Sequence, residues 1–199
     1  MTNSPKQSGH LADGAAWAEV VREALAEGAV NTFRELIQAE TLPLSARVAN
    51  VADLWEQLNM AEKPAERMRA AAVARIELPR KVPGLIALLA PASTMRFICE
   101  RYLPPDSTVS EDILMDVAGE LTNVIAGQVK TALKGTPFHF QMSTPKTSFS
   151  SDWNAIWAEL AQALAAPTNA STNQSSPTLV IEGEFGRLLL FVQLIPCEQ

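Results

Sequence analysis

The chain has 199 residues, enough for one domain with a sizeable core, and this length argues against two full domains. Hydrophobic residues make up 47% of the chain and charged residues 19%, which is typical of a globular protein rather than a disordered one. The net charge of −6 and the lack of a basic stripe with interleaved aromatic residues argue against nucleic acid as the main partner.

The first part of the chain predicts a tail, a long helix and a mixed segment. Residues 1–13 are polar and are expected to form a mobile tail. From Ala15 to about Ala39, apolar residues recur at helical spacing and predict an amphipathic helix. In the next stretch, Leu44–Val51 is compatible with a short strand and Val51–Met60 with a short helix.

Two strands and a second helix are predicted next. Met68–Leu78 and Gly84–Ala90 are rich in Val, Ile, Leu and Ala and are punctuated by prolines, which suits adjacent strands joined by a tight basic turn, Arg80–Lys81. Ser93–Leu103 then predicts a helix with Ser93 as its N-cap, ended by two prolines.

The last third of the chain predicts strands around one short helix. Apolar and polar residues alternate over Phe138–Ser143, which predicts a half-buried strand. Trp153–Leu164 predicts a short amphipathic helix whose two tryptophans suit core packing better than a partner patch, and Ala166–Pro177 predicts a mobile polar loop. Thr178–Glu182 and Arg187–Ile195 predict a terminal strand pair. The second strand is apolar at nearly every position, so it is central or paired with another subunit.

Signals for export, membrane insertion and metal binding are missing from the sequence. Residues 1–14 have no apolar core of a signal peptide, and the longest apolar run, near Val82–Ala92, is too short to span a bilayer. Cys99 and Cys197 match no metal spacing and are expected to be reduced, packed thiols. We therefore expect a cytoplasmic protein without a membrane segment or a metal site.

The helix predicted over Thr108–Gly135 carries most of the information about function. Thr108 and Glu111 have the spacing of a capping box, and Gly135 suits the left-handed position that ends a helix. At about 100° of rotation per residue, one stripe should face the core, namely Leu114, Ala118, Leu121, Ile125 and Ala132. Nearly opposite, within an arc of roughly 60°, lie Asp116, Glu120, Asn123 and Gly127.

This polar face is unusual for a purely structural surface. Asp112, Asp116 and Glu120 follow one another at i, i+4 spacing, where like charges cost a few tenths of a kcal/mol per pair. Gly119 and Gly127 each cost about 1 kcal/mol relative to alanine inside a helix. From spacing alone, a solvated acidic face is the simpler interpretation, and a functional one needs a further argument.

That argument is a resemblance in sequence. Asp116-x3-Glu120-x2-Asn123 has the D/S-x3-E-x2-N spacing of the CheC/CheX/FliY class of chemotaxis phosphatases. The surrounding segment GELTNVIAGQVKTALKG, residues 119–135, closely resembles the signature helix of CheX and its relatives. Outside this helix the resemblance rests on the order of elements, over about residues 15–194.

The resemblance implies a fold class and a domain plan. It implies a single α/β domain of the CheC/CheX type, in which long helices pack on a mainly antiparallel sheet. The domain is expected to span residues 14–199, with insertions near 42–66 and 151–177.

A glutamate and an asparagine one turn apart suit only a few reactions. Neither is a nucleophile of choice, and Asn123 cannot act as a general base, but its amide can hold a water molecule through one donor and one acceptor. Phosphoryl transfer is the chemistry in which such positioning is enough, because catalysis there is mostly orientation and charge stabilisation. A phosphoaspartate is already activated, and the protein that carries it can supply Mg²⁺ and a lysine.

The resemblance assigns roles to these residues. CheX-like proteins hydrolyse the phosphoaspartate of CheY-type response regulators, so Asn123 is expected to orient water and Glu120 to bind the regulator's lysine. Asp116 takes a supporting role, and Gly127 lets the partner's backbone approach. The resemblance also implies that the protein has no cofactor of its own, that the regulator holds Mg²⁺, and that the protein is a homodimer formed through the sheets.

CheC-type relatives can carry a second copy of the motif on the first helix. Glu23, Glu27 and Asn31 come near it, but the last step is three residues instead of two. Asn31 is thereby rotated away by about 100°, so we predict one site per chain.

Two other hypotheses remain open at this stage. The chain is a non-catalytic module that binds a response regulator or another signalling partner, or its acidic helix has no ligand and the Trp153/Trp157 helix makes the real contacts.

Overall fold

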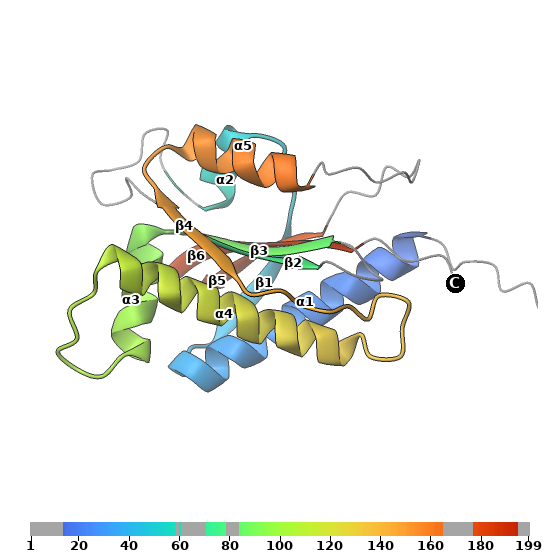
Figure 1. The fold of residues 1–199 in the computed structure, drawn as a ribbon, viewed down its shortest axis with the longest axis horizontal. Coiled ribbons are helices and arrows are strands. Elements are labelled where there is room, and N and C mark those ends of the chain that lie inside the picture. The colour runs from blue at the N-terminus through green and yellow to red at the C-terminus, as the bar shows by residue number, and fades with distance from the viewer. Residues whose placement is uncertain (1–13, 59, 61–70, 79–83, 165–176, 195–199) are drawn as a thin grey trace, which may run out of the picture.

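The computed structural model describes residues 14–58, 60, 71–78, 84–164 and 177–194. In this part of the chain, a six-stranded sheet lies between two layers of helices (Figure 1). The strands are β1 (Thr41–Ala46), β2 (Ala71–Leu78), β3 (Gly84–Pro91), β4 (Lys146–Ser150), β5 (Thr178–Gly183) and β6 (Gly186–Leu194). The helices are α1 (Gly14–Ile37), α2 (Val51–Gln57), α3 (Ala92–Tyr102), α4 (Glu111–Ala132) and α5 (Trp153–Leu164).

The order of strands in the sheet is β1-β5-β6-β3-β2-β4, and every neighbouring pair is antiparallel. The predicted fold class, helices packed on a mainly antiparallel sheet, is therefore confirmed. The predicted tail over residues 1–13, the turn at Arg80–Lys81 and nearly all of the loop at 166–177 lie outside the described residues.

The topology contains an internal repeat that the sequence does not reveal. The series α1-β1-α2-β2-β3 is followed, after α3, by α4-β4-α5-β5-β6. If each strand of the first series is exchanged with its counterpart in the second, the sheet has the same order of strands, read from its other edge. An approximate two-fold axis therefore passes between the central strands β3 and β6. At this centre Leu88 faces Leu190 and Leu89 faces Leu189 across the antiparallel pair.

The first layer, α1, α3 and α4, covers one face of the sheet (Figure 1). α4 lies over β2 and β4, and α1 lies over β1 and β5, so each long helix covers one half of the sheet. Their apolar stripes meet the sheet in one core, whose fully buried members include Leu25, Phe33, Ile76, Leu88, Ile98, Leu114, Leu121 and Ile125. Ala132, predicted to lie on this stripe, is exposed because it is the last residue of α4.

The second layer, α2 and α5, covers the opposite face of the sheet. Leu54 of α2 and Leu160 of α5 are fully buried there, together with Val73, Leu89 and Leu189 of the strands. Trp153 is only 4% exposed, which confirms core packing as the role of this tryptophan. β6 is apolar at nearly every position because it is a central strand with helices on both faces.

Both predicted N-caps were wrong. The hydroxyl of Ser110, not that of Thr108, caps α4, because the helix begins at Glu111 and the Ser110 side chain accepts from the Ile113 N–H at 3.4 Å. α3 begins directly after Pro91 and has no side-chain cap, so Ser93 lies inside its first turn.

The strand predicted over Phe138–Ser143 was also wrong. Phe138 and Phe140 are buried and His139 is exposed, as the alternation predicted, but the segment starts in a turn. The N–H groups of Phe138 and His139 are both hydrogen-bonded to Thr136 rather than to a neighbouring strand. The strand forms later, as β4, which pairs with β2 at the edge of the sheet.

Three glycines inside the long helices differ in what surrounds them. A Cβ added at Gly28 of α1 would lie 3.1 Å from the Cβ of Gln128 on α4, and one added at Gly119 would lie 3.1 Å from Cγ2 of Thr147 on β4. These two glycines therefore allow α1 and β4 to approach α4 closely. A Cβ added at Gly127 would meet no described atom within 4 Å, so the packing of the chain does not require glycine there.

Gly127→Ala is expected to stabilise the protein by about 1 kcal/mol, because alanine lowers the entropy cost of helix formation and meets no neighbour. In a chain of this size that corresponds to a rise in Tm of about 2–4 °C. Gly119→Ala is the matched control in the same helix, and should gain less or lose stability because Thr147 has to move. Thermal unfolding followed by circular dichroism measures both, and equal rises would contradict the close packing at Gly119.

Cys99 lies fully buried on α3, and burial raises the pKa of its thiol to about 11. The reactive thiolate is therefore scarce at neutral pH, as expected for a packed thiol. Cys197 lies outside the described residues.

In a Cys197→Ser background, we expect Cys99 to react with an aromatic disulfide reagent at pH 8 only after unfolding in denaturant. The absorbance of the released thiolate measures the rate. Fast labelling of the native protein would show that the first core layer opens around α3.

Candidate functional site

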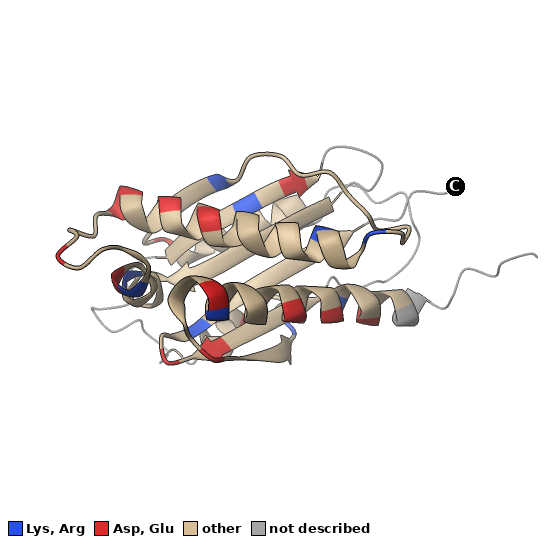
Figure 2. Ribbon diagram, turned by 90° about the horizontal axis from the view of Figure 1, so that it is seen from below, with Lys and Arg blue, Asp and Glu red and all other residues tan. Residues whose placement is uncertain are grey.

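The outer face of α4 presents the four predicted site residues together. The helix runs unbroken over its 22 residues, with Asp116 and Glu120 exposed and Asn123 and Gly127 half-buried. The face opposite to them is packed on the sheet through Leu121 and its neighbours on the apolar stripe. Seen from this side, acidic residues occupy the N-terminal half of α4, and one basic residue, Lys130, lies in its last turn (Figure 2).

The intramolecular contacts of α4 leave the polar groups of this face unused. Carboxylates in the first turn of a helix are stabilised by the helix dipole, which accounts for Glu111 and Asp112 but falls off before Asp116 and Glu120. No ion pair within the described residues includes Asp116 or Glu120. Nor does the carboxamide of Asn123 form a hydrogen bond to another described residue, so these groups are open to a molecule outside the chain.

Two close contacts hold the central turns of α4 from opposite sides. Gly119 faces Thr147 and Pro145 at the sheet edge, and Gln128 faces Gly28 on α1. Positions 119 and 128 are about 180° apart around the helix axis. The hydroxyl of Thr122, which is fully buried, donates to the carbonyl of Ala118 at 2.7 Å and leaves no unsatisfied group beneath the site. The turn that carries Glu120 and Asn123 is thus fixed in position while its outer side stays free.

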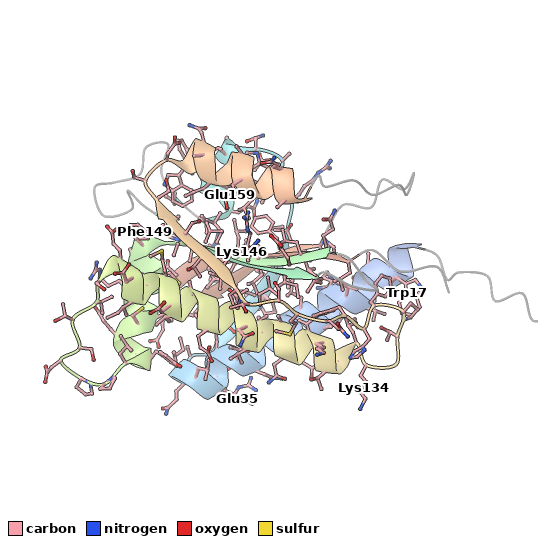
Figure 3. The ribbon with its side chains drawn as sticks, in the orientation of Figure 1. Trp17, Glu35, Lys134, Lys146, Phe149 and Glu159 are labelled. Carbon is pink, nitrogen blue, oxygen red and sulfur yellow. The ribbon has the colours of Figure 1, made fainter. Side chains whose placement is uncertain are left out.

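The edge strand β4 forms one rim of this face, which the sequence analysis missed. Lys146 follows the segment that packs on Gly119, and its ammonium group donates to Glu77 of β2 at 2.7 Å (Figure 3). This hydrogen bond lowers the pKa of the Glu77 carboxyl. The only sequence signal for this rim was Pro145, which interrupts the polar stretch just before the strand.

α1 lies beside α4 and runs in the opposite direction (Figure 1). Glu27 is exposed and Asn31 is half-buried. Val30 stands three residues after Glu27, where the motif places asparagine. α1 therefore does not present a glutamate and an asparagine with the spacing found in α4.

The described residues contain no group of three or more His, Cys, Asp or Glu side chains that could hold a metal ion. In the same part of the chain, no helix has the length and apolar character needed to cross a membrane. What α4 offers is one carboxylate and one carboxamide in fixed relative positions on a solvent-facing helix. Such a pair can bind a cationic group and hold a water molecule.

Comparisons with known proteins point to one family. Residues 72–169 match the family model of the chemotaxis phosphatase CheX. The chain is similar to solved structures of the chemotaxis protein CheX from Vibrio vulnificus (TM-score 0.57, 14% identity, covering 88% of this chain and 96% of that one) and from Desulfovibrio desulfuricans (0.54, 16%, 88% and 99%). It is also similar to the CheX–CheY–BeF3–Mg²⁺ complex from Borrelia burgdorferi (0.50, 14%, 86% and 96%). No curated protein sequence matches the chain.

The matched segment runs from β2 through α5 and includes all of α4 with its motif. The sheet order and the helix layers agree with a fold shared by the CheX structures. Residues 72–169, with α4 among them, thus match the CheX family model, and the chain has the fold of the CheX structures.

Proposed function

We propose that this chain hydrolyses the phosphoaspartate of a CheY-type response regulator at the outer face of α4. One observation carries the proposal: Glu120 and Asn123 lie one turn apart on an unbroken helix, without partners among the described residues. The Borrelia burgdorferi structure, a complex of CheX with CheY, BeF3 and Mg²⁺, supports a regulator of this kind as the partner. The activity is then cytoplasmic, where such regulators work.

The reaction needs little from the enzyme beyond orientation. A water molecule attacks phosphorus in line with the acyl oxygen, the P–O bond to the aspartyl carboxyl breaks, and the products are aspartate and inorganic phosphate. Asn123 accepts one hydrogen bond from this water and donates another through its amide, which fixes the direction of attack. The regulator carries the Mg²⁺ and the lysine that stabilise charge on the phosphoryl oxygens, so this chain needs no cofactor of its own.

Glu120 and Gly127 have different roles in docking. Glu120 forms a charge-assisted pair with the regulator's lysine and so sets the distance between α4 and the acyl phosphate. Gly127 lies two turns further along the helix in an open position, where the absence of a side chain lets the partner's backbone come close. Asp116 supports the same contact one turn before Glu120.

A second function uses the same face without turnover. A binding module would also present acidic residues and an open glycine to a regulator. The exposed Glu120 and the open space at Gly127 therefore fit both functions. The free carboxamide of Asn123 favours hydrolysis, because a docking surface has no need of a group that holds water. The two functions differ in whether phosphate is released.

Asn123→Ala should lower the rate of dephosphorylation of a phosphorylated receiver domain by a factor on the order of 10² or more, since the attacking water loses its orientation. Binding of the receiver activated with beryllofluoride should be nearly unchanged. Loss of the radioactive phosphoryl group measures the rate of dephosphorylation, and calorimetry measures the binding.

Asn154→Ala, at an exposed asparagine in the opposite helix layer, is the matched control. Equal rates for Asn123→Ala and the unsubstituted chain would exclude the mechanism, and binding without any release of phosphate would establish the binding module.

Glu120→Ala should weaken receiver binding roughly 10- to 100-fold, the loss expected when a hydrogen bond to a charged group is removed. Glu56→Ala on α2 is exposed and removes the same charge from the far side, so it should leave the affinity unchanged.

Gly127→Leu should also weaken receiver binding without unfolding the chain, because a side chain there meets only the partner. Ala132→Leu places the same side chain at an exposed position of the same helix and should bind normally. Surface plasmon resonance with the beryllofluoride-activated receiver measures both variants. Normal binding by Gly127→Leu would show that α4 contacts the partner elsewhere.

A further inference from the structure

The outward face of α4 carries the same order of side chains twice. The two series repeat at intervals of seven residues, one being Asp116, Asn123 and Lys130 and the other Glu120, Gly127 and Lys134. Seven residues make just under two turns, so each step drifts by only about 20° around the helix and advances roughly 10 Å along it. Both series therefore run along the helix from a carboxylate, through a neutral residue, to a lysine, and Figure 2 shows this separation of charge.

Lys130 and Lys134 lie where a docked partner would meet them. Lys130 is half-buried in the last turn of α4. Lys134 is exposed in the turn that continues the helix, where its N–H donates to the Thr131 carbonyl at 3.2 Å. Neither ammonium group is part of an ion pair within the described residues, whereas Lys146 of β4 is paired with Glu77. Both lysines are therefore open to an acidic group outside the chain.

The helix dipole explains only part of this arrangement. A cation in the last turn is stabilised by the partial negative charge of the helix C-terminus, whichever side of the helix it occupies. Both lysines, however, lie within about 20° of Asn123 around the helix axis. The dipole gives no reason for this shared side, and neither does an ion pair within the described part of the chain.

We propose that Lys130 and Lys134 bind a carboxylate of the response regulator and so fix the direction in which the regulator lies along α4. This rests on the proposed function, since the partner is the same phosphorylated regulator. It also predicts the complementary surface of that partner. The regulator's lysine, which pairs with Glu120, is followed roughly 15 Å further along the helix by an acidic side chain.

The neutral middle of each series cannot decide the direction of docking. A regulator turned end for end would place its lysine beside Lys130 and its carboxylate beside Glu120, so like charges would meet at both ends. Such contacts disfavour the reversed complex, and the opposite-charge pairs favour the other one. Only in the favoured complex does the acyl phosphate lie at Asn123, between the two charged ends of α4.

Reversing the charge of each lysine tests the proposal. Lys130→Glu and Lys134→Glu should each weaken binding of the beryllofluoride-activated receiver roughly 5- to 10-fold at low salt, and the loss should shrink at high salt. KM for the phosphorylated receiver should rise to the same extent, while kcat stays within about twofold, because Asn123 is unchanged. The matched control is Arg47→Glu, at an exposed position just beyond β1 on the other edge of the sheet.

A charge exchange on the receiver identifies the group that the lysines bind. Among receivers in which one surface carboxylate each is changed to lysine, one should bind Lys130→Glu more tightly than it binds the unsubstituted chain. The proposal is overturned if both lysine variants bind the receiver as tightly as Arg47→Glu does, or if no receiver variant restores the affinity.

These outcomes are distinguishable from those of the phosphatase assay. Release of phosphate, with unchanged binding by the lysine variants, would disprove the directing contact and retain the enzymatic function. Salt-dependent loss of binding in those variants, without release of phosphate by the unsubstituted chain, would retain the contact and disprove the enzymatic function. A receiver that does not bind the unsubstituted chain would overturn both.

Discussion

The packing of α4 against the sheet, α1 and β4 is the interaction on which the rest of the structure depends. Its apolar stripe is buried on β2. Gly119 lets β4 approach α4 from one side, and Gly28 of α1 lets α1 approach it from the other. A helix held on three sides cannot rotate about its axis without breaking those contacts, because close-packed interiors tolerate shifts of only a fraction of an ångström. The fourth side is therefore presented to solvent in a fixed orientation. That fixed orientation is what a water-positioning amide requires.

The same packing separates structural glycines from one that the fold does not need. Gly28 and Gly119 are explained by near neighbours, and alanine at either position would press on another element. Gly127 has no such neighbour, although it weakens the helix by about as much as they do. A residue that costs stability and relieves no contact within the described chain is best explained by a molecule outside it. The proposed docking of a regulator on α4 gives this glycine a physical reason.

The helix layer on the opposite face serves a different purpose. α2 and α5 lie in corresponding places of the two halves of the topology, and both bury apolar side chains on the sheet. The stretches 42–66 and 151–177, expected to be insertions, include most of β1 and all of α2 and α5. With them, each strand at the centre of the sheet is covered on both faces within one chain. This leaves the outer face of α1 and α4 as the surface where recognition is most easily explained.

The sequence by itself determined the periodic elements and the motif, because these depend on residues a few positions apart. Helical spacing located α1, α4 and α5 to within a few residues, and the Asp116, Glu120 and Asn123 spacing fixed their shared face of the helix. Local pattern also predicted the burial of Phe138 and Phe140, but not that they lie outside a strand, since strand pairing depends on a partner far away in sequence. The two-fold order of the strands, the reason for Gly119 and the rim at Lys146 were decided only by the tertiary structure. The contacts at Gly119 and Lys146, and the pairs β1–β5, β3–β6 and β2–β4, join segments more than twenty residues apart, for which no spacing rule in a single sequence exists.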